Sequence, residues 1–272
     1  MTEPYVHGFD ERSRQRLDDQ AASIDELVHC DTVFPPGARV VEFGCATGAQ
    51  TLLLGSLVAA SHGWLLALDR SCVMLAEARQ RLDEAGHQGV ALVLADARQV
   101  PLADASADQV VIRFLLEHVD DPVAVLRSAH RILRPGGRIV VIEGDHGPTS
   151  LHPDDPAAHE AIACQVTLQR RLGGDPMIGR RLRPLLHEAG FTDVVVSPRL
   201  VHADGSRPHL QQRFTLATFT AMIAGVRDEA LAAGLITPER FDAGIAALRR
   251  SAQPDGVFLY LFMKATASRP AT

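Results

Sequence analysis

Residues 40–50, VVEFGCATGAQ, begin as an apolar run that contains one acid, Glu42, and end as a loop of small residues. A short apolar run followed by a glycine-containing loop is typical of a buried parallel strand that turns into a helix. The N-terminus of such a helix favours anions, so a phosphate ligand is the usual expectation. Here Glu42 precedes the first glycine by two residues, and its charge opposes a phosphate group.

The same strand-like pattern recurs along the first half of the chain. Strands are expected at residues 39–43, 64–69, 91–95, 108–113 and 138–143. Amphipathic helices are expected between them, at 49–61, 71–86 and 121–133. Near-continuous apolar strands that alternate with helices indicate a parallel sheet covered on both faces. We therefore predict an α/β fold with a doubly wound sheet.

Beyond residue 145, polar and proline-containing connections replace this regular alternation. Helices are expected at 157–172, 178–189, 215–233 and 238–250, and strands at 192–201 and 256–265. We interpret residues 1–272 as a single domain that has an N-terminal helical segment over 1–30 and a cofactor-binding core over 36–147. The helices within 148–190 and 205–253 are expected to form a lid at the carboxyl edge of the sheet, where open α/β folds bind ligands.

Composition narrows the partners. The net charge of −6 and the isoelectric point near 6.0 provide no basic surface for nucleic acid. The first 20 residues lack the apolar core of a signal peptide, and no stretch approaches the roughly 20 apolar residues of a membrane span. Four scattered cysteines fit reduced thiols better than a disulfide framework. We expect a cytoplasmic protein, and the sequence leaves a homodimer open.

The loop pattern excludes one common ligand class and favours another. A dinucleotide fold needs G-x-G-x-x-G, but Ala46 and Ala49 replace two of those glycines. The residues instead fit E-x-G-x-x-x-G, made by Glu42, Gly44 and Gly48. A carboxylate at the entrance of the loop favours a cationic ligand. S-adenosylmethionine, which carries an ammonium and a sulfonium and no phosphate, fits this requirement.

Two further acids are expected at the same sheet edge. Asp69 ends the second strand, where a carboxylate accepts hydrogen bonds from ribose hydroxyls. Asp96 follows the third strand, where it is placed to accept a hydrogen bond from an adenine amino group. An acid such as Asp69 would serve NAD equally well. The structural alternatives are a helix cap for Asp69 and a turn acid for Asp96.

Five segments together resemble a known family: VVEFGCATG, LLALDRSCVMLAEAR, LVLADARQVPLADASADQVV, LLEHVDDPVAVLRSAHRILRPGGRIVVIE and LLHEAGFTDVVV. The chain resembles the class I S-adenosylmethionine-dependent methyltransferases of the ubiquinone/menaquinone-biosynthesis and small-molecule group over about residues 38–196. The resemblance implies a seven-stranded, mostly parallel sheet, Rossmann-like, in which the last strand is antiparallel and lies inside the sheet.

The resemblance also implies S-adenosylmethionine as the cofactor. It assigns to the cofactor site Glu42, Gly44, Cys45, Gly48, Asp69, Arg70, Asp96, Ala97, Arg113 and Phe114. In related enzymes an N-terminal segment folds over the cofactor, which adds Tyr5 and Gln20; the alternative is a helix that merely covers the sheet edge. Ala46 stands where the family most often has glycine, which narrows the loop without removing the site.

The acceptor side is expected at the ends of the fourth and fifth strands. Methyl transfer is an in-line displacement, so the enzyme mainly positions a nucleophile, and a base helps only when the acceptor keeps a proton. The candidates for catalysis are His118, Asp145 and His146, with Glu117 and Glu143 beside them. The alternatives are that His118 caps or packs under the next helix and that EGDHG, residues 143–147, is a solvated turn.

Two other motifs receive structural interpretations. LRPGG, residues 133–137, combines a proline that stops a helix with two glycines that permit a tight turn into the fifth strand. HPDDPAAHE, residues 152–160, matches no standard metal-ligand spacing, so no metal is expected. The sequence thus predicts methyl transfer from S-adenosylmethionine to a nitrogen or oxygen of a small organic acceptor. The alternatives are a non-catalytic cofactor-binding or regulatory protein and an NAD-dependent oxidoreductase.

Overall fold

The computed structural model describes residues 19, 23–87 and 89–271. The chain divides into two compact units. The first, here called the sheet unit, comprises Val28–Gly144, Ile178–Pro198 and Met263–Thr272. The second, here called the insertion unit, comprises Asp145–Met177 and Arg199–Phe262, with the described residues before Val28. Residues 178–190, which were expected among the lid helices, therefore belong to the sheet unit.

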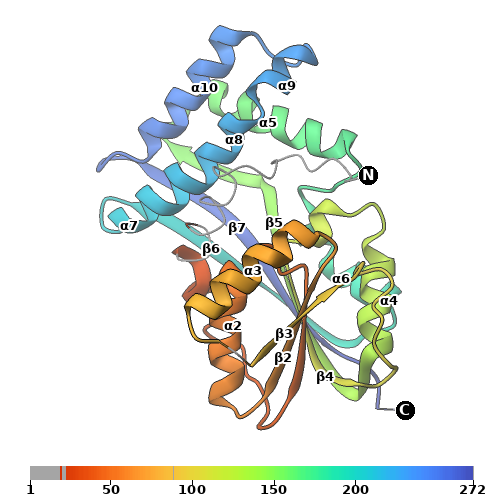
Figure 1. The fold of residues 1–272 in the computed structure, drawn as a ribbon. Helices are drawn as coiled ribbons and strands as arrows, with labels where there is room; N and C mark the ends of the chain where they lie inside the picture. Colours follow the sequence, from red (N-terminus) through yellow and green to blue (C-terminus); the bar gives the residue numbers. More distant parts are fainter. Residues whose placement is uncertain (1–18, 20–22, 88, 272) are drawn as a thin grey trace. The chain divides into compact units, whose positions relative to one another are not determined.

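Seven strands form one sheet in the order β3-β2-β1-β4-β5-β7-β6 (Figure 1). They are β1 (Arg39–Phe43), β2 (Trp64–Asp69), β3 (Val90–Leu94), β4 (Ala107–Arg113), β5 (Leu133–His152), β6 (Thr192–Asp204) and β7 (Val257–Ser268). Strand β1 pairs in parallel with β2 and β4, β2 with β3, and β4 with β5. The predicted doubly wound sheet is confirmed, including the position of the last strand inside it. Because β1–β4 are parallel, their carboxyl ends meet at one edge.

Alternating strand residues build two separate cores in the sheet unit. Val41 and Phe43 of β1 belong to the core that contains residues of α4 (Pro122–Ile132) and α6 (Leu182–Glu188). Val40 belongs to the other core, with residues of α2 (Ala49–Ala60) and α3 (Cys72–Glu84). Successive strand residues point to opposite faces, so each face carries its own helix layer. The strands are almost continuously apolar in the sequence because both of their faces are buried.

Local signals fix the starts of two helices in the sheet unit. The hydroxyl of Ser71 accepts a hydrogen bond from the Met74 N–H at 3.3 Å and caps α3. The Asp121 carboxylate accepts one from the Ala124 N–H at 2.9 Å and caps α4, whose first residue is Pro122. Both are the N-cap arrangement, in which a side-chain oxygen binds an N–H that has no partner within the helix.

The helix expected at 178–189 forms as two pieces, η2 (Ile178–Arg181) and α6. Pro184 stands in the first turn of α6. Proline lacks an N–H and its ring clashes with the carbonyl four residues earlier, so an α-helix does not continue upstream through it. A 3₁₀ turn replaces the expected first helical turn.

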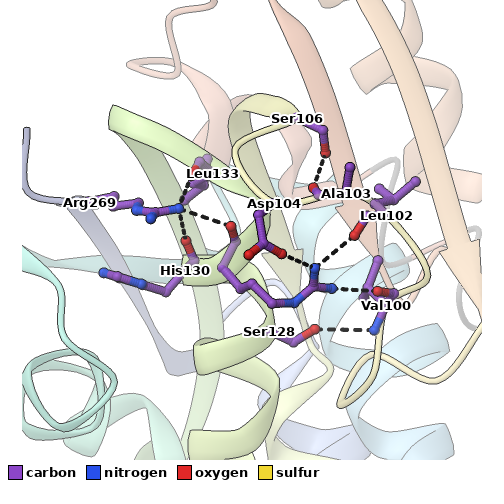
Figure 2. Close-up of polar contacts among 10 residues, drawn as sticks. Val100, Leu102, Ala103, Asp104, Ser106, Ser128, His130, Leu133 and Arg269 are labelled. Atoms are coloured by element: carbon purple, nitrogen blue, oxygen red, sulfur yellow. Dashed lines mark hydrogen bonds and ion pairs between the residues drawn. The ribbon is translucent and has the colours of Figure 1, made fainter.

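Two arginines hold the end of α4, as Figure 2 shows. Arg269 Nη1 donates to the carbonyls of His130 at 3.1 Å and Arg131 at 2.9 Å, and also to that of Leu133. Arg131 in turn donates to the carbonyls of Leu102 at 2.8 Å and Val100 at 2.6 Å. The last carbonyls of a helix lack partners within the helix, and a guanidinium supplies donors for them. Residue 269 thereby stabilises a helix end more than 130 positions earlier in the chain.

The LRPGG segment differs from the prediction in one respect. Helix α4 ends at Ile132 as expected, but β5 already begins at Leu133, which pairs with Ala107, whereas Arg138 pairs with Gln109. Residues 134–137 therefore form an irregularity inside the strand. Only Gly136 has a positive φ, of 74°. Gly137 is required for space, since a Cβ there would lie 2.8 Å from the Arg134 carbonyl oxygen.

The insertion unit contains one tight helix pair and one irregular helical segment. Gly244 of α10 (Pro238–Ser251) packs on α5 (Pro156–Arg171) so closely that a Cβ would lie 2.4 Å from the Ala157 carbonyl oxygen. After α5, the insertion unit also contains α7 (Pro208–Leu210), the π-helix η3 (Gln211–Thr220), α8 (Ala221–Gly225) and α9 (Arg227–Ala232).

The single helix expected at 215–233 is therefore wrong in detail, because it starts earlier and breaks into three pieces. The hydroxyls of Thr218 and Thr220 donate to the carbonyls of Arg213 and Thr215, at 2.7 and 2.6 Å. Threonine side chains that bond to carbonyls of the preceding turn compete with the regular α-helical ladder. The wider π-helix, which often occurs at functional sites, accommodates them.

Candidate active site

The loop after β1 contains three left-handed residues: Gly44 at φ 75°, Ala46 at φ 46° and Gly48 at φ 75°. Space restricts the two glycines as well. A Cβ on Gly44 would lie 3.1 Å from the Leu115 side chain, and one on Gly48 would lie 3.0 Å from Ala78. The left-handed conformation costs an alanine roughly 1–2 kcal/mol. Position 46 therefore favours glycine, which adopts a positive φ without this cost.

Asp69 holds that strained residue. Its Oδ2 accepts a hydrogen bond from the Ala46 N–H at 2.9 Å, and its Oδ1 accepts one from the Ser71 N–H at 2.9 Å. The helix cap of α3 is Ser71, so the alternative interpretation of Asp69 as that cap is wrong. Burial raises the pKa of Asp69 above its ordinary value. Backbone N–H groups of Ala46, Ser71 and Arg70 use three of the roughly four acceptor positions of this carboxylate, so one remains for a ligand hydroxyl.

Asp96 lies in a turn after β3, where the Gln99 N–H donates to its carbonyl oxygen at 3.0 Å. Its carboxylate accepts from the Arg98 backbone N–H at 2.8 Å and from Arg98 Nη2 at 2.7 Å. These bonds to Arg98 hold the pKa of Asp96 below its ordinary value. The turn-acid interpretation is therefore observed, and contact with an adenine stays a prediction. Ala97 is buried in the same turn, and Arg70 is exposed directly after Asp69.

Glu42 and Arg113 form a buried ion pair between the ends of β1 and β4. The second carboxylate oxygen of Glu42 accepts from the Thr51 hydroxyl at 2.8 Å. Both oxygens of the Glu42 carboxylate thus have partners within the protein. Glu42 precedes the glycine loop, and its partner Thr51 lies on helix α2, which follows the loop. Direct contact of Glu42 or Arg113 with a cationic ligand stays a prediction. Cys45 is buried next to them, and desolvation raises the pKa of its thiol, so it packs as a neutral side chain.

A second buried glutamate, Glu143 of β5, binds the loop that follows β4. Glu143 Oε1 accepts from the backbone N–H groups of Leu115 and Leu116, at 3.0 and 2.8 Å. Burial, and then the negative charge of Glu117, raise the pKa of Glu143 well above its ordinary value. Phe114 adopts φ 50° at this point. A bulky residue in the left-handed region is a genuine outlier of the kind that clusters at functional sites.

His118 belongs to the 3₁₀ turn η1 (Leu116–His118) in the sheet unit. Its Nε2 lies 3.6 Å from Glu117 Oε1, which makes an ion pair when the imidazole is protonated. The following helix is capped by Asp121, so His118 does not cap it. A catalytic role for His118 stays a prediction.

Asp145 and His146 belong to the insertion unit, and the alternative interpretation of EGDHG as a solvated turn is wrong. Strand β5 continues through this segment to His152, and both side chains are buried. The Asp145 carboxylate accepts from the Gly147 N–H at 3.0 Å. His146 Nδ1 lies 2.7 Å from the Tyr260 hydroxyl of β7. A long strand thus places this histidine in the interior of the insertion unit.

Five aromatic residues accompany His146. The imidazole packs 5.3 Å from the ring of Tyr260 and 5.9 Å from that of Phe219. The aromatic cluster, defined here as Phe214, Phe219, Phe258, Tyr260 and Phe262, is connected by ring centroid distances of 4.8–6.3 Å. Sequence reasoning missed Tyr260. The signal was the spacing of two between residues 258, 260 and 262, which puts their rings on one face of a strand.

The remaining predictions concern the N-terminal segment, the HPDDPAAHE motif, metal binding and membrane spans. Tyr5 and Gln20 lie outside the described residues. In HPDDPAAHE, His159 Nε2 lies 2.7 Å from Asp154 Oδ1, and Asp155 caps α5 through the Ala157 N–H at 2.8 Å. Within 23–87 and 89–271, no group of three histidine, cysteine or acidic side chains is arranged to hold a metal ion. Over the same residues, no helix has both the length and the apolar character of a membrane span.

Comparison with known proteins identifies part of the chain. Residues 41–141 match the model of a methyltransferase domain. A demethylmenaquinone methyltransferase of Mycobacterium sp. (strain KMS) is 43% identical over 108 residues, 40% of this chain and 42% of the relative. An uncharacterized 37.1 kDa protein in transposon TN4556 of Streptomyces fradiae is 33% identical over 163 residues, 60% of this chain and 46% of the relative. The chain thus spans less than half the length of these curated relatives.

Solved structures show the same fold. The [4+2]-cyclase SpnF aligns with a TM-score of 0.57 and 20% identity over 99% of this chain and 86% of that one. This likeness supports the architecture and does not specify a reaction. The match over residues 41–141, together with the strand order, shows that this part of the chain is a methyltransferase domain within a Rossmann-like α/β fold.

Proposed function

We propose that this protein transfers the methyl group of S-adenosylmethionine to a nitrogen or oxygen of a small organic acceptor. The observation that carries the proposal is the Asp69 carboxylate at the end of β2. It holds the glycine loop through the Ala46 N–H and keeps an acceptor position beside its bonds to the Ala46, Ser71 and Arg70 N–H groups. A ribose hydroxyl would donate to that position.

The other residues of the loop fit the same cofactor. The buried Thr47 hydroxyl has no hydrogen-bond partner among the described residues, and buried hydroxyls are nearly always paired. It would donate to the carboxylate of the methionine part. Gly44 and Gly48 would let the cofactor approach the backbone closely. When bound, the cofactor supplies a methyl group on a positively charged sulfur.

The acceptor is proposed to meet Asp145 and His146. The Tyr260 hydroxyl binds Nδ1 of His146 and so fixes the orientation of the ring. A carboxylate and an imidazole suit an acceptor that arrives as an ammonium or a phenol, because one can hold the charge or the hydroxyl while the other takes the proton. The lid role of the helices in the insertion unit stays a prediction.

Asp69→Asn tests the cofactor site. The amide keeps the shape of the side chain but loses acceptors for the ribose, so the affinity for S-adenosylmethionine should fall by about 1–3 kcal/mol. Titration calorimetry measures it, with Asp83→Asn on the exposed side of α3 as the control. Unchanged affinity would remove Asp69 from the site. Binding of NADH instead would favour the oxidoreductase, and cofactor binding without methylated products in a metabolite screen would favour the non-catalytic protein.

His146→Ala tests the acceptor site. Turnover should fall while cofactor affinity stays within about twofold, and the loss should shrink at high pH, where more acceptor is already deprotonated. Tyr260→Phe is the matched variant, since it keeps the aromatic ring and removes only the hydroxyl. It should lower turnover about 3- to 10-fold, the effect of one lost hydrogen bond on the base. Wild-type turnover in both variants would leave this pair as part of the core.

A further inference from the structure

A row of six hydrogen-bonded polar side chains, five of them buried and Thr32 partly buried, runs through the sheet unit. Its members come from five parts of the sequence, and neighbours along it are in hydrogen-bond contact. In order they are Lys264 of β7, Thr32, His29, Arg113 of β4, Glu42 of β1 and Thr51 of α2. None of Lys264, Thr32 and His29 was indicated by sequence motifs. The last two members of this row flank the glycine loop, because Glu42 precedes Gly44 and Thr51 follows Gly48.

The two neighbours of His29 determine which of its ring nitrogens carries the proton. Arg113 Nη1 lies 2.8 Å from His29 Nε2, and a guanidinium has only donors. His29 Nε2 must therefore accept, which leaves the ring proton on Nδ1. From there it faces the Thr32 hydroxyl oxygen at 3.3 Å, and that oxygen also accepts from Lys264 Nζ at 2.7 Å. The neutral imidazole is thus oriented from both sides.

The surroundings keep His29 neutral. The side chain is 6% exposed. Burial lowers its pKa to about 3, with further lowering by the positive charges of Arg113 and Lys264 and a smaller opposite effect of Asp31. Lys264 itself is held by the Val28 carbonyl at 2.8 Å and by the Asp31 carboxylate, so its charge is fixed in place. At neutral pH the imidazole of His29 is therefore uncharged, and its Nε2 accepts the hydrogen bond from Arg113.

The orientation of Arg113 determines that of Glu42. The guanidinium is a rigid planar fork, so fixing Nη1 on His29 also fixes the direction of Nη2, which binds the Glu42 carboxylate. The other oxygen of Glu42 then meets Thr51. Loss of the acceptor at position 29 would leave a buried donor of Arg113 unsatisfied, and the fork would turn to find another partner. The Glu42 carboxylate and the loop between Gly44 and Gly48 would shift with it.

We propose that His29 is a positioning residue for the cofactor, which acts through Arg113 and Glu42 to hold the glycine loop in its binding conformation. It does so without contacting the cofactor. This inference rests on the proposed function, since it requires the loop to bind S-adenosylmethionine. A role in stability alone would lower the melting temperature in any variant of this residue and leave the affinity of the folded protein unchanged.

Three variants separate these possibilities, with S-adenosylhomocysteine as the probe in titration calorimetry. His29→Leu removes the acceptor and should raise the dissociation constant about tenfold, the effect of an unsatisfied charged donor. His29→Gln places an amide oxygen near the position of Nε2 and should stay within about threefold of the wild type. His130→Leu is the control, because His130 is a half-buried histidine of the sheet unit that packs edge-on against Phe191 and is not part of the hydrogen-bonded row.

Thr32→Val gives a second, milder test if His29→Leu does not fold. It removes the oxygen that orients Nδ1 and should raise the dissociation constant about 2- to 5-fold. A wild-type constant in every folded variant of His29 and Thr32, or an equal loss in His130→Leu and His29→Leu, would overturn the inference. A wild-type protein that does not bind the probe would instead overturn the proposed function itself.

Discussion

The sheet unit and the insertion unit bury polar groups in different ways. In the sheet unit, three buried ionisable side chains are held by ion pairs or hydrogen bonds: Glu42 by Arg113, Glu143 by two backbone N–H groups, and Lys264 by Asp31. The interior of the insertion unit is dominated by aromatic rings around the His146–Tyr260 pair. Fixed charges hold a loop in one geometry, whereas packed rings define a shape. A cofactor that is always the same suits the first, and an acceptor that varies between enzymes suits the second.

The largest expected effect comes from breaking the buried charges. Glu42→Ala leaves the Arg113 guanidinium buried without its carboxylate, and such a change typically costs about 3–5 kcal/mol of unfolding free energy. Urea denaturation measures it. The control is Glu160→Ala in the insertion unit, which removes a hydrogen-bonded but exposed partner of Arg240. We expect its midpoint to stay at that of the wild type, because exposed ion pairs contribute little. Equal losses would erase the contrast between the units.

The next effect is a pH dependence that belongs to the sheet unit. The pKa of His29 is about 3 in the folded protein, against 6.5 when unfolded. Between these values the unfolded chain binds a proton that the folded chain does not, so stability is complete above pH 6.5 and decreases as the pH falls. From pH 7 to pH 5 the loss is about 2 kcal/mol.

Urea denaturation of the wild type and of His29→Gln at both pH values isolates this contribution, since glutamine does not titrate. Glu143 acts in the opposite direction, because its raised pKa lets the folded state take up a proton first as the pH falls below that value. That contribution is common to both proteins and cancels in their difference. Parallel pH profiles of wild type and variant would show that His29 is not held neutral by the fold.

The smallest effect is a gain at the glycine loop. Ala46→Gly removes the strain of φ 46°, roughly 1–2 kcal/mol, and adds roughly 0.5–1 kcal/mol of backbone entropy to the unfolded state. The net stabilisation should be about 0.5–1 kcal/mol, visible as a higher thermal midpoint. Ala49→Gly, at the first residue of α2, is the control and should destabilise, because glycine is a poor helix former. A loss in both variants would mean that Ala46 is not strained.

Where the sequence contains a local signal, it predicted the element well. The strands β1 and β2 have the expected bounds, and the helices of the sheet unit end within three residues of theirs, because periodicity and capping residues are local properties. The errors occur where contacts override the pattern. The fifth strand was expected to end at residue 143, yet it continues to His152 and buries both Asp145 and His146.

By itself, the sequence determined the order of strands and helices, the glycine loop, and the acids Asp69 and Asp96 at the ends of their strands. Only the tertiary structure brought in His29, Lys264 and Tyr260. His29 meets Arg113 across 84 positions, Tyr260 meets His146 across 114, and Lys264 meets Val28 across 236. The physical reason is that hydrophobic periodicity depends on neighbours a few residues apart, whereas a hydrogen bond needs only that two groups meet within about 3 Å after the chain has folded.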